Sequence, residues 1–423
     1  MKHIDRQILQ IALPSIVSNI TVPLLGLIDV AIVGHLGSPA YIGAIAVGGM
    51  LFNIIYWIFG FLRMGTSGMT SQAYGKRDLL AVALCLILLQ VPIRQAAFLI
   101  IHPTAEVREM ATLYFHICIW GAPAMLGLYG LSGWFIGMQN SRIPMYIAIT
   151  QNIVNIIASL SFVCFFKMKV EGVAFGTLIA QYAGFIMGLV LWMSRYGKLK
   201  KYILWKGVLQ KEAMMRFFQV NRDIFLRTLC LVTVTLFFTS AGASQGEIIL
   251  AVNTLLMQLF TLFSYVMDGF AYAGEALSGR YIGARNRKAF TNTTRHLFIW
   301  GGWLAAFFTL VYALDGNAFL GLLTDNKDVV SAAGTYFYWA LAIPVAGIAA
   351  FIWDGIFIGA TATRGMLASM AIAAISFFVV YYGLRPVLGN HALWLAFLVY
   401  LAMRGVVQTL LSPKIIKENF TQP

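Results

Sequence analysis

Asp29 is the clearest candidate for chemistry in this sequence, because it is a single acid inside a long apolar run. In the segment PSIVSNITVPLLGLIDVAIVG it is the only ionisable residue. An ionisable side chain at the middle of a membrane span costs at least about 2.5–3.5 kcal/mol, which makes it a functional candidate. A buried carboxyl group that gains and loses a proton could couple transport to a proton gradient, and Pro14 gives the same helix a place to bend. The alternative is a carboxylate that pairs structurally with a basic residue.

Polar residues in three other apolar runs could accompany this acid. Asn155 and Ser159 lie one helical turn apart in QNIVNIIASLSF, Thr177 lies in GVAFGTLIAQ, and Ser132 lies in GLSGWFIG. Side chains of these types also hold membrane helices together. The pattern therefore leaves both an ion-binding role and a packing role open.

The second half of the chain carries further charged residues in apolar surroundings. Asp268 and Glu275 are seven residues apart and share one helical face, and Asp354 lies in AAFIWDGIFIG. Asp223 and Arg227 have the spacing of a structural pair on one helix. Met257 and Phe260 are candidates for lining a cavity for an organic cation, since aromatic faces attract positive charge.

The composition requires these residues to be positioned by membrane helices. The chain of 423 residues is 60% hydrophobic and 11% charged, with a mean hydropathy of +0.80, whereas soluble domains have about 45–50% apolar and about 25% charged residues. A span needs about 20 apolar residues, so the length predicts twelve transmembrane helices and excludes a membrane-attached soluble enzyme. The predicted spans are 9–35, 43–73, 79–101, 108–138, 142–166, 171–194, 219–242, 248–279, 292–314, 329–360, 365–388 and 391–411.

The basic residues indicate how the spans are oriented. The formal net charge is +14, and most of the 30 lysines and arginines fall on one side of the predicted spans. The positive-inside rule then places both termini in the cytoplasm. The excess of basic over acidic residues indicates contact with membrane lipids and no nucleic-acid partner. Arg63, Arg94 and Arg227 fall within apolar runs, and Arg404 is counted with the cytoplasmic basic residues.

An internal repeat relates the two halves of the chain. Residues 114–142 resemble residues 336–364 with an offset of 222, and Gly75 matches Gly283 with an offset of 208. Six spans are repeated in parallel, which is typical of transporters whose substrate site lies between the halves. The difference of 14 residues makes the third span unusually short. Either residues near 78–82 are missing from the sequence or that span is tilted.

The repeat predicts the domain organisation. We expect an N-terminal six-helix bundle over 1–194, a basic cytoplasmic linker over 195–218, a C-terminal six-helix bundle over 219–415 and a cytoplasmic tail over 416–423. Asp354 falls at the repeat position of Ser132. With an offset of 205, Arg63 falls at the repeat position of Asp268. Such charged residues could form a central lock between the halves or could pair locally.

Several motifs in order resemble the DinF branch of the multidrug and toxic compound extrusion (MATE) transporters. The resemblance runs over residues 5–412 and is carried by LPSIVSNITVPLLGLIDVAIVGHLGSP, FLRMGTSGMTSQAYGKRD, NRDIFLRTL and MDGFAYAGEALSG. It implies an all-α polytopic membrane protein with two pseudo-symmetric six-helix bundles around a central cavity. Members of the family expel cationic or amphipathic drugs while H⁺ or Na⁺ moves inward.

The resemblance also implies site residues. The coupling acid of the family falls on Asp29 and its associated proline on Pro14. The positions that match the polar group around this acid are Tyr114, Ser132, Asn155 and Thr177. Related members carry a second acid where this chain has Ser159, which disfavours a Na⁺ site there. In the second bundle Asp354 falls where other branches have cation-site acids.

The sequence therefore predicts a secondary active multidrug antiporter in the inner membrane, which is not an enzyme. We expect H⁺ as the coupling ion, with Na⁺ less favoured, no other cofactor, cationic or amphipathic small molecules as substrates, and a monomer. A flippase for lipid-linked precursors is the main alternative and would need a strongly cationic cavity. An intramembrane enzyme would need convergent catalytic residues, and His116 is the only histidine well inside a span. A channel would not need two conformational states.

Overall fold

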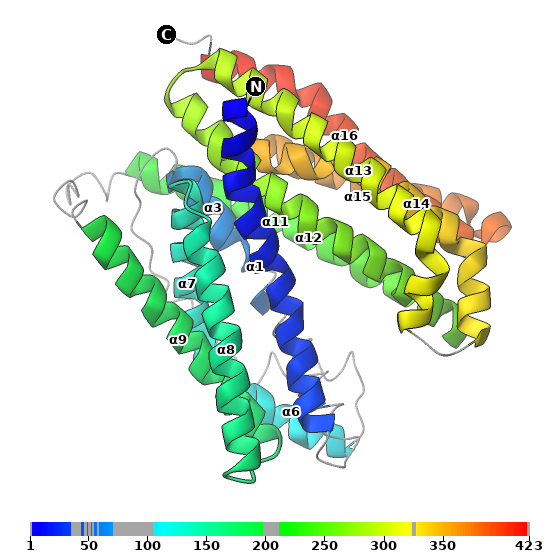
Figure 1. The fold of residues 1–423 in the computed structure, drawn as a ribbon. Coiled ribbons are helices and arrows are strands. Elements are labelled where there is room, and N and C mark those ends of the chain that lie inside the picture. Colours follow the sequence, from blue (N-terminus) through cyan, green and yellow to red (C-terminus); the bar gives the residue numbers. More distant parts are fainter. Residues whose placement is uncertain are drawn as a thin grey trace. The chain divides into compact units, whose positions relative to one another are not determined.

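The computed structural model describes residues 2–34, 44–45, 49, 52, 55–56, 59–70, 105–197, 211–323 and 327–420. Within these ranges every regular element is a helix (Figure 1). The third predicted span, 79–101, lies outside the described residues, as do parts of the second span and of the linker between the halves.

The chain divides into two compact units. One contains residues Val17–Phe217, and the other contains Met1–Ile16 together with Phe218–Pro423. The boundary between the units falls inside the first helix, which is continuous from Lys2 to Gly34. We refer to them as the N-terminal unit and the C-terminal unit.

The N-terminal unit contains most of α1 and the helices of the first half of the chain. Their bounds are α1 Lys2–Gly34, α3 Phe61–Thr70, α6 Ala105–Cys118, α7 Ala122–Gly137, α8 Arg142–Cys164 and α9 Val170–Tyr196. A short 3₁₀ turn, η1 (Ile119–Gly121), joins α6 to α7. Helix α9 packs against α6, α7 and α8, and α3 packs against α7.

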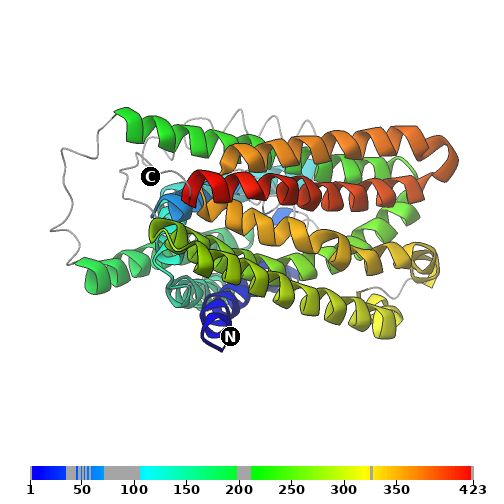
Figure 2. The same cartoon turned by 90° about the horizontal axis from the view of Figure 1, so that it is seen from above.

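The C-terminal unit contains the start of α1 and six helices of the second half. Their bounds are α11 Lys211–Ala243, α12 Glu247–Gly283, α13 Arg287–Leu323, α14 Lys327–Gly359, α15 Thr363–Leu388 and α16 Asn390–Phe420. Helix α14 packs against α12, α13 and α16, and α15 lies beside α16 (Figure 2). Helix α14 is thus the central element of this unit.

Small residues allow α12 and α14 to approach closely. A Cβ atom on Gly355 would lie 2.1 Å from the carbonyl oxygen of Ala271, and a Cβ atom on Gly359 would lie 2.3 Å from that of Glu275. Small residues at helix interfaces are typical of membrane proteins, in which close packing replaces the hydrophobic drive between helices. This contact fixes the position of α14 and therefore of Asp354.

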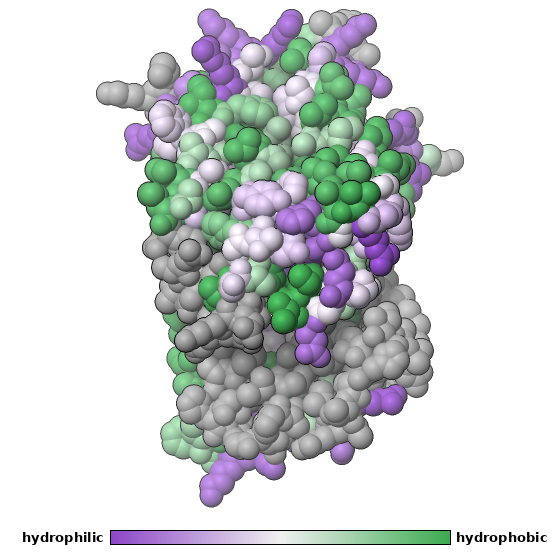
Figure 3. Space-filling model, turned by 90° about the vertical axis from the view of Figure 1, so that its right-hand side faces the viewer, coloured by the Kyte–Doolittle hydropathy of each residue, from purple (hydrophilic) through white to green (hydrophobic). Residues whose placement is uncertain are grey.

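Nine segments of the described part are long and apolar enough to cross a membrane. They coincide with the fourth to twelfth predicted spans. Figure 3 shows one face of the molecule, where hydrophilic side chains gather at the upper end and hydrophobic ones occupy much of the band below. Large apolar side chains on the helices are exposed, including Trp303 at 72% and Leu314 at 77%. Exposed apolar surface of this kind suits a lipid environment. The all-α membrane fold is confirmed.

The turns after α7 and α14 share one backbone geometry. Gln139 has φ 61° and Thr361 has φ 54°, and these two residues are related by the offset of 222. In both turns the next residue donates its amide to the carbonyl five positions earlier, from Asn140 to Phe135 and from Ala362 to Phe357. The sequence repeat therefore has a local structural counterpart at these turns.

The same comparison corrects one prediction. Gly133 and its repeat mate Gly355 each face a backbone carbonyl of another helix, that of Arg63 on α3 and that of Ala271 on α12 respectively. The structural counterpart of Arg63 is therefore Ala271, at an offset of 208, and not Asp268. The offset of 205 was wrong because a shift of three residues keeps a similar helical face and preserves the apolar pattern.

Candidate functional site

Asp29 lies in the last third of α1 and is buried, with 4% of its surface exposed. The hydroxyl of Thr177 on α9 donates a hydrogen bond to its Oδ2 over 3.4 Å. Asn155 on α8 donates from Nδ2 to the same hydroxyl over 3.0 Å. Three helices distant in the sequence thus place an amide, a hydroxyl and a carboxyl group in one chain of contacts.

This chain of contacts leaves hydrogen-bonding capacity unused. Among the described residues, no group donates to Oδ1 of Asp29 or to Oδ1 of Asn155. No basic side chain in the described part forms an ion pair with Asp29. A buried carboxylate with so little compensation is costly when ionised, whereas its protonated form is neutral and can itself donate. The geometry suits a group whose charge changes during function.

Helix α1 is held beside this site by a second amide of α8. Asn152 donates from Nδ2 to the carbonyl oxygen of Thr21 over 2.8 Å. Asn152 and Asn155 are three residues apart, so both face α1. The sequence analysis missed Asn152, although its spacing from Asn155 was a usable signal. Pro14 lies earlier in α1 and is half-buried, and the helix continues through it.

The other predicted residues of the first half lie at different distances from the chain of contacts. Tyr114 on α6 is buried, and its hydroxyl interacts with Thr177 and lies within electrostatic reach of Asp29. Ser159 is fully buried against Gly176 of α9, one turn from Asn155. The structure records no polar contact for the half-buried Ser132 on α7. Tyr114 therefore belongs to the Asp29 group, and Ser159 borders it.

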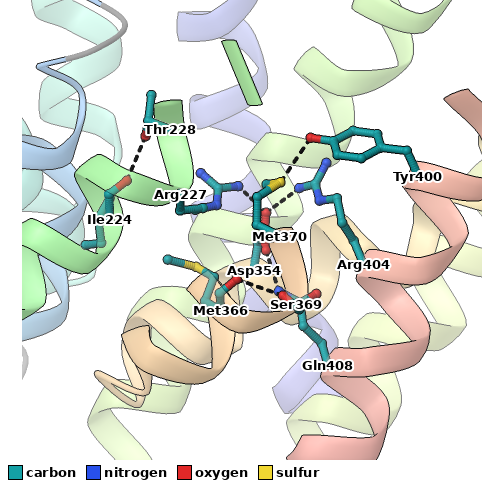
Figure 4. Close-up of polar contacts among 10 residues, drawn as sticks. All are labelled: Ile224, Arg227, Thr228, Asp354, Met366, Ser369, Met370, Tyr400, Arg404 and Gln408. Carbon is teal, nitrogen blue, oxygen red and sulfur yellow. Dashed lines mark hydrogen bonds and ion pairs between the residues drawn. The ribbon is translucent and has the colours of Figure 1, made fainter. Parts of the chain in front are cut away.

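Asp354 on α14 is also buried, but it has a different environment (Figure 4). Its Oδ2 accepts hydrogen bonds from the guanidinium groups of Arg227 on α11 and Arg404 on α16, the latter over 2.6 Å. Its Oδ1 accepts one from Nε2 of Gln408 over 2.6 Å. All four side chains are buried. The Asp354 cluster, as we call these four residues, joins three helices through one carboxylate.

The Asp354 cluster is a fixed arrangement of charge. Two guanidinium groups contact a single carboxylate, so the carboxylate remains ionised, and removing it would leave two buried cations without the partner that they share. Breaking a buried ion pair from one side typically costs about 3–5 kcal/mol. Helix α16 also places Arg404 5.5 Å from the ring centre of Tyr400. The arrangement suits a structural connection better than a group that cycles between charge states.

Two predictions about this region were wrong. Arg227 does not pair with Asp223 four residues earlier; Asp223 instead accepts hydrogen bonds from Arg222 and Thr363. Arg404 was counted as cytoplasmic, but its side chain is buried within the unit. The first error arose because helical spacing shows only contacts within one helix, whereas the partner of Arg227 lies on α14. The second arose because Arg404 was grouped with the basic residues outside the spans, although it falls inside the predicted span 391–411. The spacing of Arg404 and Gln408 on one helical face was a signal for the cluster.

The remaining predicted residues of the second half belong to the C-terminal unit. Asp268 on α12 is half-buried and lies within electrostatic reach of Arg404, and Glu275 is buried on the same helix. Met257 is half-buried. Phe260 packs its ring 5.1 Å from that of Phe397, so it takes part in helix packing.

Arg63 and His116 are the last two residues of the sequence analysis to be located. Arg63 is half-buried near the start of α3. His116 is exposed on α6. In the described part of the chain, no group of three or more His, Cys, Asp or Glu side chains could hold a metal ion.

Comparison with known proteins identifies the family. The family model described as MatE matches residues 14–160 and 224–384, which is more than half of the chain. The chain is 39% identical over 420 residues to DNA damage-inducible protein F of Escherichia coli K12, covering 95% of this chain and 90% of that protein. It is 22% identical to a probable multidrug resistance protein NorM of Synechococcus, covering 92% of this chain and 88% of that protein.

Solved structures share the fold at low sequence identity. The Vibrio cholerae MATE transporter VcmN in its bent form matches with a TM-score of 0.87 and 16% identity, over 99% of this chain and 98% of that chain. A MOP superfamily transporter from Pyrococcus furiosus matches with a TM-score of 0.81 and 17% identity, over 99% and 97%. The family is one of transporters and not of enzymes. The chain therefore belongs to the MatE family and is a polytopic membrane transporter of the DinF type.

Proposed function

We propose that this transporter is a proton-coupled antiporter, in which inward movement of H⁺ drives export of cationic or amphipathic organic compounds. The observation that carries the proposal is the environment of Asp29. Its carboxyl group is buried, accepts a hydrogen bond from Thr177, lies within reach of the Asn155 side chain, and has no basic partner among the described residues. Such a group can gain and lose a proton without disrupting an ion pair.

The proposed mechanism is alternating access. Protonation removes the charge of Asp29, so a state that buries Asp29 becomes more stable relative to one in which water reaches it. A ligand that shifts a two-state equilibrium from 1:99 to 99:1 must prefer one state by about 5.5 kcal/mol. Burial of an unpaired carboxylate can supply several kcal/mol of this difference. Substrate would then bind the state with ionised Asp29 and leave from the state with protonated Asp29.

We favour H⁺ over Na⁺ because the site has one carboxylate. Related members carry a second acid where this chain has Ser159, so a Na⁺ site that uses two carboxylates lacks one of them here. In the C-terminal unit, Arg227 and Arg404 already neutralise Asp354. We propose no other cofactor.

The substrates are proposed from the chemistry of the chain and from relatives. The Synechococcus relative is named a probable multidrug resistance protein. Cationic or amphipathic compounds suit a chain rich in aromatic residues and methionine. A flippase that recognises phosphate groups would need unpaired basic side chains, whereas the buried Arg227 and Arg404 are bound to Asp354. Export of organic cations is therefore the better supported function.

The finer architecture is part of the same proposal. We propose twelve spans in two pseudo-symmetric six-helix bundles, with both termini in the cytoplasm of a bacterial cell and the transporter in the inner membrane as a monomer in contact with lipid. The boundaries predicted from the repeat, 1–194 and 219–415, define the two bundles.

The experiment that tests the proposal measures export of a fluorescent organic cation from proteoliposomes. A proton gradient and a sodium gradient are imposed separately. We expect the wild-type protein to respond to the proton gradient, and Asp29→Asn to reduce transport to the level of empty vesicles with unchanged reconstitution. Asp5→Asn is the matched control, because it makes the same substitution in the same helix before the predicted span.

Three results would contradict parts of the proposal. Wild-type transport by Asp29→Asn would exclude Asp29 as the coupling group. Transport driven by the sodium gradient alone would exclude H⁺ as the required ion. Movement of a lipid-linked phosphate without transport of the organic cation would favour a flippase.

A further inference from the structure

A second group of buried polar side chains lies next to the Asp29 site in the N-terminal unit. Gln181 is four residues after Thr177 on α9, so it lies one turn further along the same face. Tyr56 lies beside the Gln181 amide. Each of these two side chains is 8% exposed. Neither was a candidate in the sequence analysis.

Gln181 faces the 3₁₀ turn between α6 and α7. A Cβ atom on Gly121 would lie 1.6 Å from Oε1 of Gln181, so only glycine at this position leaves room for the amide. The turn Ile119–Gly121 interrupts what would otherwise be one long helix. A 3₁₀ segment within a helix often marks a functional hinge. The structure thus places a polar side chain against a break in its neighbouring helix.

Tyr56 combines this polar contact with aromatic neighbours. Its ring stacks on Phe52 at 5.6 Å and meets Tyr129 edge-on at 6.4 Å. Its hydroxyl group is also within electrostatic reach of Cys118. The rings therefore fix the position of the Tyr56 side chain by packing.

Tyr114 and Cys118 connect this group to the Asp29 site. They are four residues apart on α6 and interact with each other. The hydroxyl of Tyr114 interacts with Thr177, and the Cys118 thiol donates to the carbonyl of Ala174 over 3.7 Å. Polar groups therefore continue from Asp29, through Thr177 and Tyr114, to Tyr56 and Gln181.

Buried oxygen atoms without partners mark both ends of this series. Among the described residues, no hydrogen bond reaches Oδ1 of Asp29, Oδ1 of Asn155, Oγ of Ser159, the hydroxyl of Tyr56 or Oε1 of Gln181. More than about 90% of buried polar groups in proteins have a protein or water partner, so a concentration of exceptions requires an explanation. Water that bridges several buried polar groups is a common one.

We propose that Tyr56 and Gln181 form the inward step of a proton path that begins at Asp29. This inference rests on the proposed function, since it assigns a route to the proton that Asp29 carries. In each transfer one O–H bond breaks and another forms. Asp29 gives its proton to water or a hydroxyl group, the Tyr56 hydroxyl accepts one proton while donating its own, and the Gln181 amide orients water without being protonated. The last proton enters cytoplasmic water, and Asp29 becomes a carboxylate again.

The test uses Tyr56→Phe and Gln181→Met in the full-length protein in proteoliposomes. Both substitutions keep the packing volume and remove only the polar atoms. We expect proton-driven export of the fluorescent cation to slow by at least about a hundredfold if the path is the main route, as for loss of a positioned proton-transfer group. Affinity for the fluorescent cation should remain at the wild-type value. The solvent deuterium isotope effect on export should rise, because proton transfer becomes rate-limiting.

Two control variants separate the path from general packing. Tyr182→Phe removes a hydroxyl group from the next residue of α9, where it donates to the carbonyl of Trp120 outside the path. Gly121→Ala would displace the Gln181 amide, whereas Gly127→Ala would press on the apolar ring of Phe185 at the same pair of helices. We expect Gly121→Ala to reproduce the increased isotope effect and Gly127→Ala to leave it unchanged.

The outcomes are distinguishable. If Tyr56→Phe and Gln181→Met export at the wild-type rate with an unchanged isotope effect, the path is wrong while the role of Asp29 stands. If both variants slow export but the isotope effect stays at its wild-type value, the residues act in packing and the path is also wrong. If the wild-type protein shows no response to a proton gradient, the proposed function and the path both fail.

Discussion

Asp29 and Asp354, two buried aspartates of this transporter, differ in how their charge is compensated. Asp29 in the N-terminal unit has only uncharged polar partners among the described residues, the Thr177 hydroxyl and the Asn155 amide. Asp354 in the C-terminal unit accepts hydrogen bonds from two guanidinium groups and an amide. Both side chains are similarly buried, at 4% and 6% exposure. Burial alone therefore does not determine what a carboxyl group can do; its partners do.

The comparison shows that a change of charge would have different consequences in the two units. Neutralising Asp29 removes one poorly compensated charge. Neutralising Asp354 removes the negative charge that Arg227 and Arg404 share, so the two buried cations repel each other. The repeat strengthens this contrast, because the first-half position equivalent to Asp354 is Ser132, which has no charge. The two halves share helices and turns, but they have placed their charged groups at different positions.

The largest effect on stability should come from Asp354→Asn. The substitution leaves Arg227 and Arg404 without their shared counter-charge, and we expect a loss of about 3–5 kcal/mol. Asp29→Asn should cause no loss, because it removes an uncompensated buried carboxyl charge. The measurement is the midpoint of thermal unfolding of both variants in detergent. Equal destabilisation by the two substitutions would remove the distinction between these aspartates.

A second substitution tests the cause of that loss. Replacing Arg227 with Met in the Asp354→Asn background reduces the number of buried cations to one. We expect part of the lost stability to return. If the double variant is less stable than Asp354→Asn, the loss does not come from uncompensated positive charge.

An intermediate effect is expected from Thr177→Val, which keeps the shape of the side chain and removes the hydroxyl. The ionised Asp29 carboxylate then loses a hydrogen bond worth about 1.5–3 kcal/mol. We expect export to slow by about tenfold, since 1.4 kcal/mol corresponds to one factor of ten. Thr228→Val is the control, because the Thr228 hydroxyl bonds only a carbonyl of its own helix. Similar rates for the two variants would exclude a specific role of the Thr177 hydroxyl.

The smallest effect concerns Asp5, an acid of α1 that lies before the predicted span. Nδ1 of His296 and Nε1 of Trp300 donate to its Oδ1 over 2.8 and 3.1 Å. The hydrogen bond from His296 lowers the pKa of Asp5 below its usual value. A lowered pKa means that this carboxylate stabilises the fold above the usual Asp pKa, and that the contribution is lost as the pH falls through the folded-state pKa.

We expect Asp5→Asn to reduce stability at neutral pH by less than about 1 kcal/mol, because the pair is partly exposed. The difference from wild type should disappear in acid, below both pKa values of Asp5. Thermal unfolding at neutral and acidic pH measures this. A difference that persists unchanged in acid would show that the carboxylate charge is not its source. Asp29→Asn in the same assay extends the comparison to a carboxyl group without a basic partner.

Much of the Asp29 site could be predicted because its signals are local. An acid alone in an apolar run is visible in the sequence, and the motif of the family placed Asn155, Thr177 and Tyr114 near it. Asn152, Tyr56 and Gln181 were missed, since a buried amide or tyrosine in a membrane helix also occurs in ordinary packing. Only the contacts of Asn152 with the α1 backbone and of Gln181 with Gly121 distinguish these residues.

The Asp354 cluster was less predictable for a physical reason. Arg227, Asp354 and Arg404 lie on three helices, and their sequence separations of 127 and 50 residues give no periodic signal. The nearest opposite charge in the sequence, Asp223, was the wrong partner for Arg227. Helical spacing describes one helix, whereas the lowest-energy partner of a buried charge is chosen among all helices that surround it.

The sequence by itself determined that this chain is a polytopic helical membrane protein with an internal repeat and an unusual acid in its first helix. These properties follow from composition, helical length and local spacing, which do not depend on how the helices pack. Tertiary structure decided which acid is fixed and which can change its charge. That difference depends on the side chains that surrounding helices bring within hydrogen-bond distance, because the cost of a buried charge is set by its neighbours.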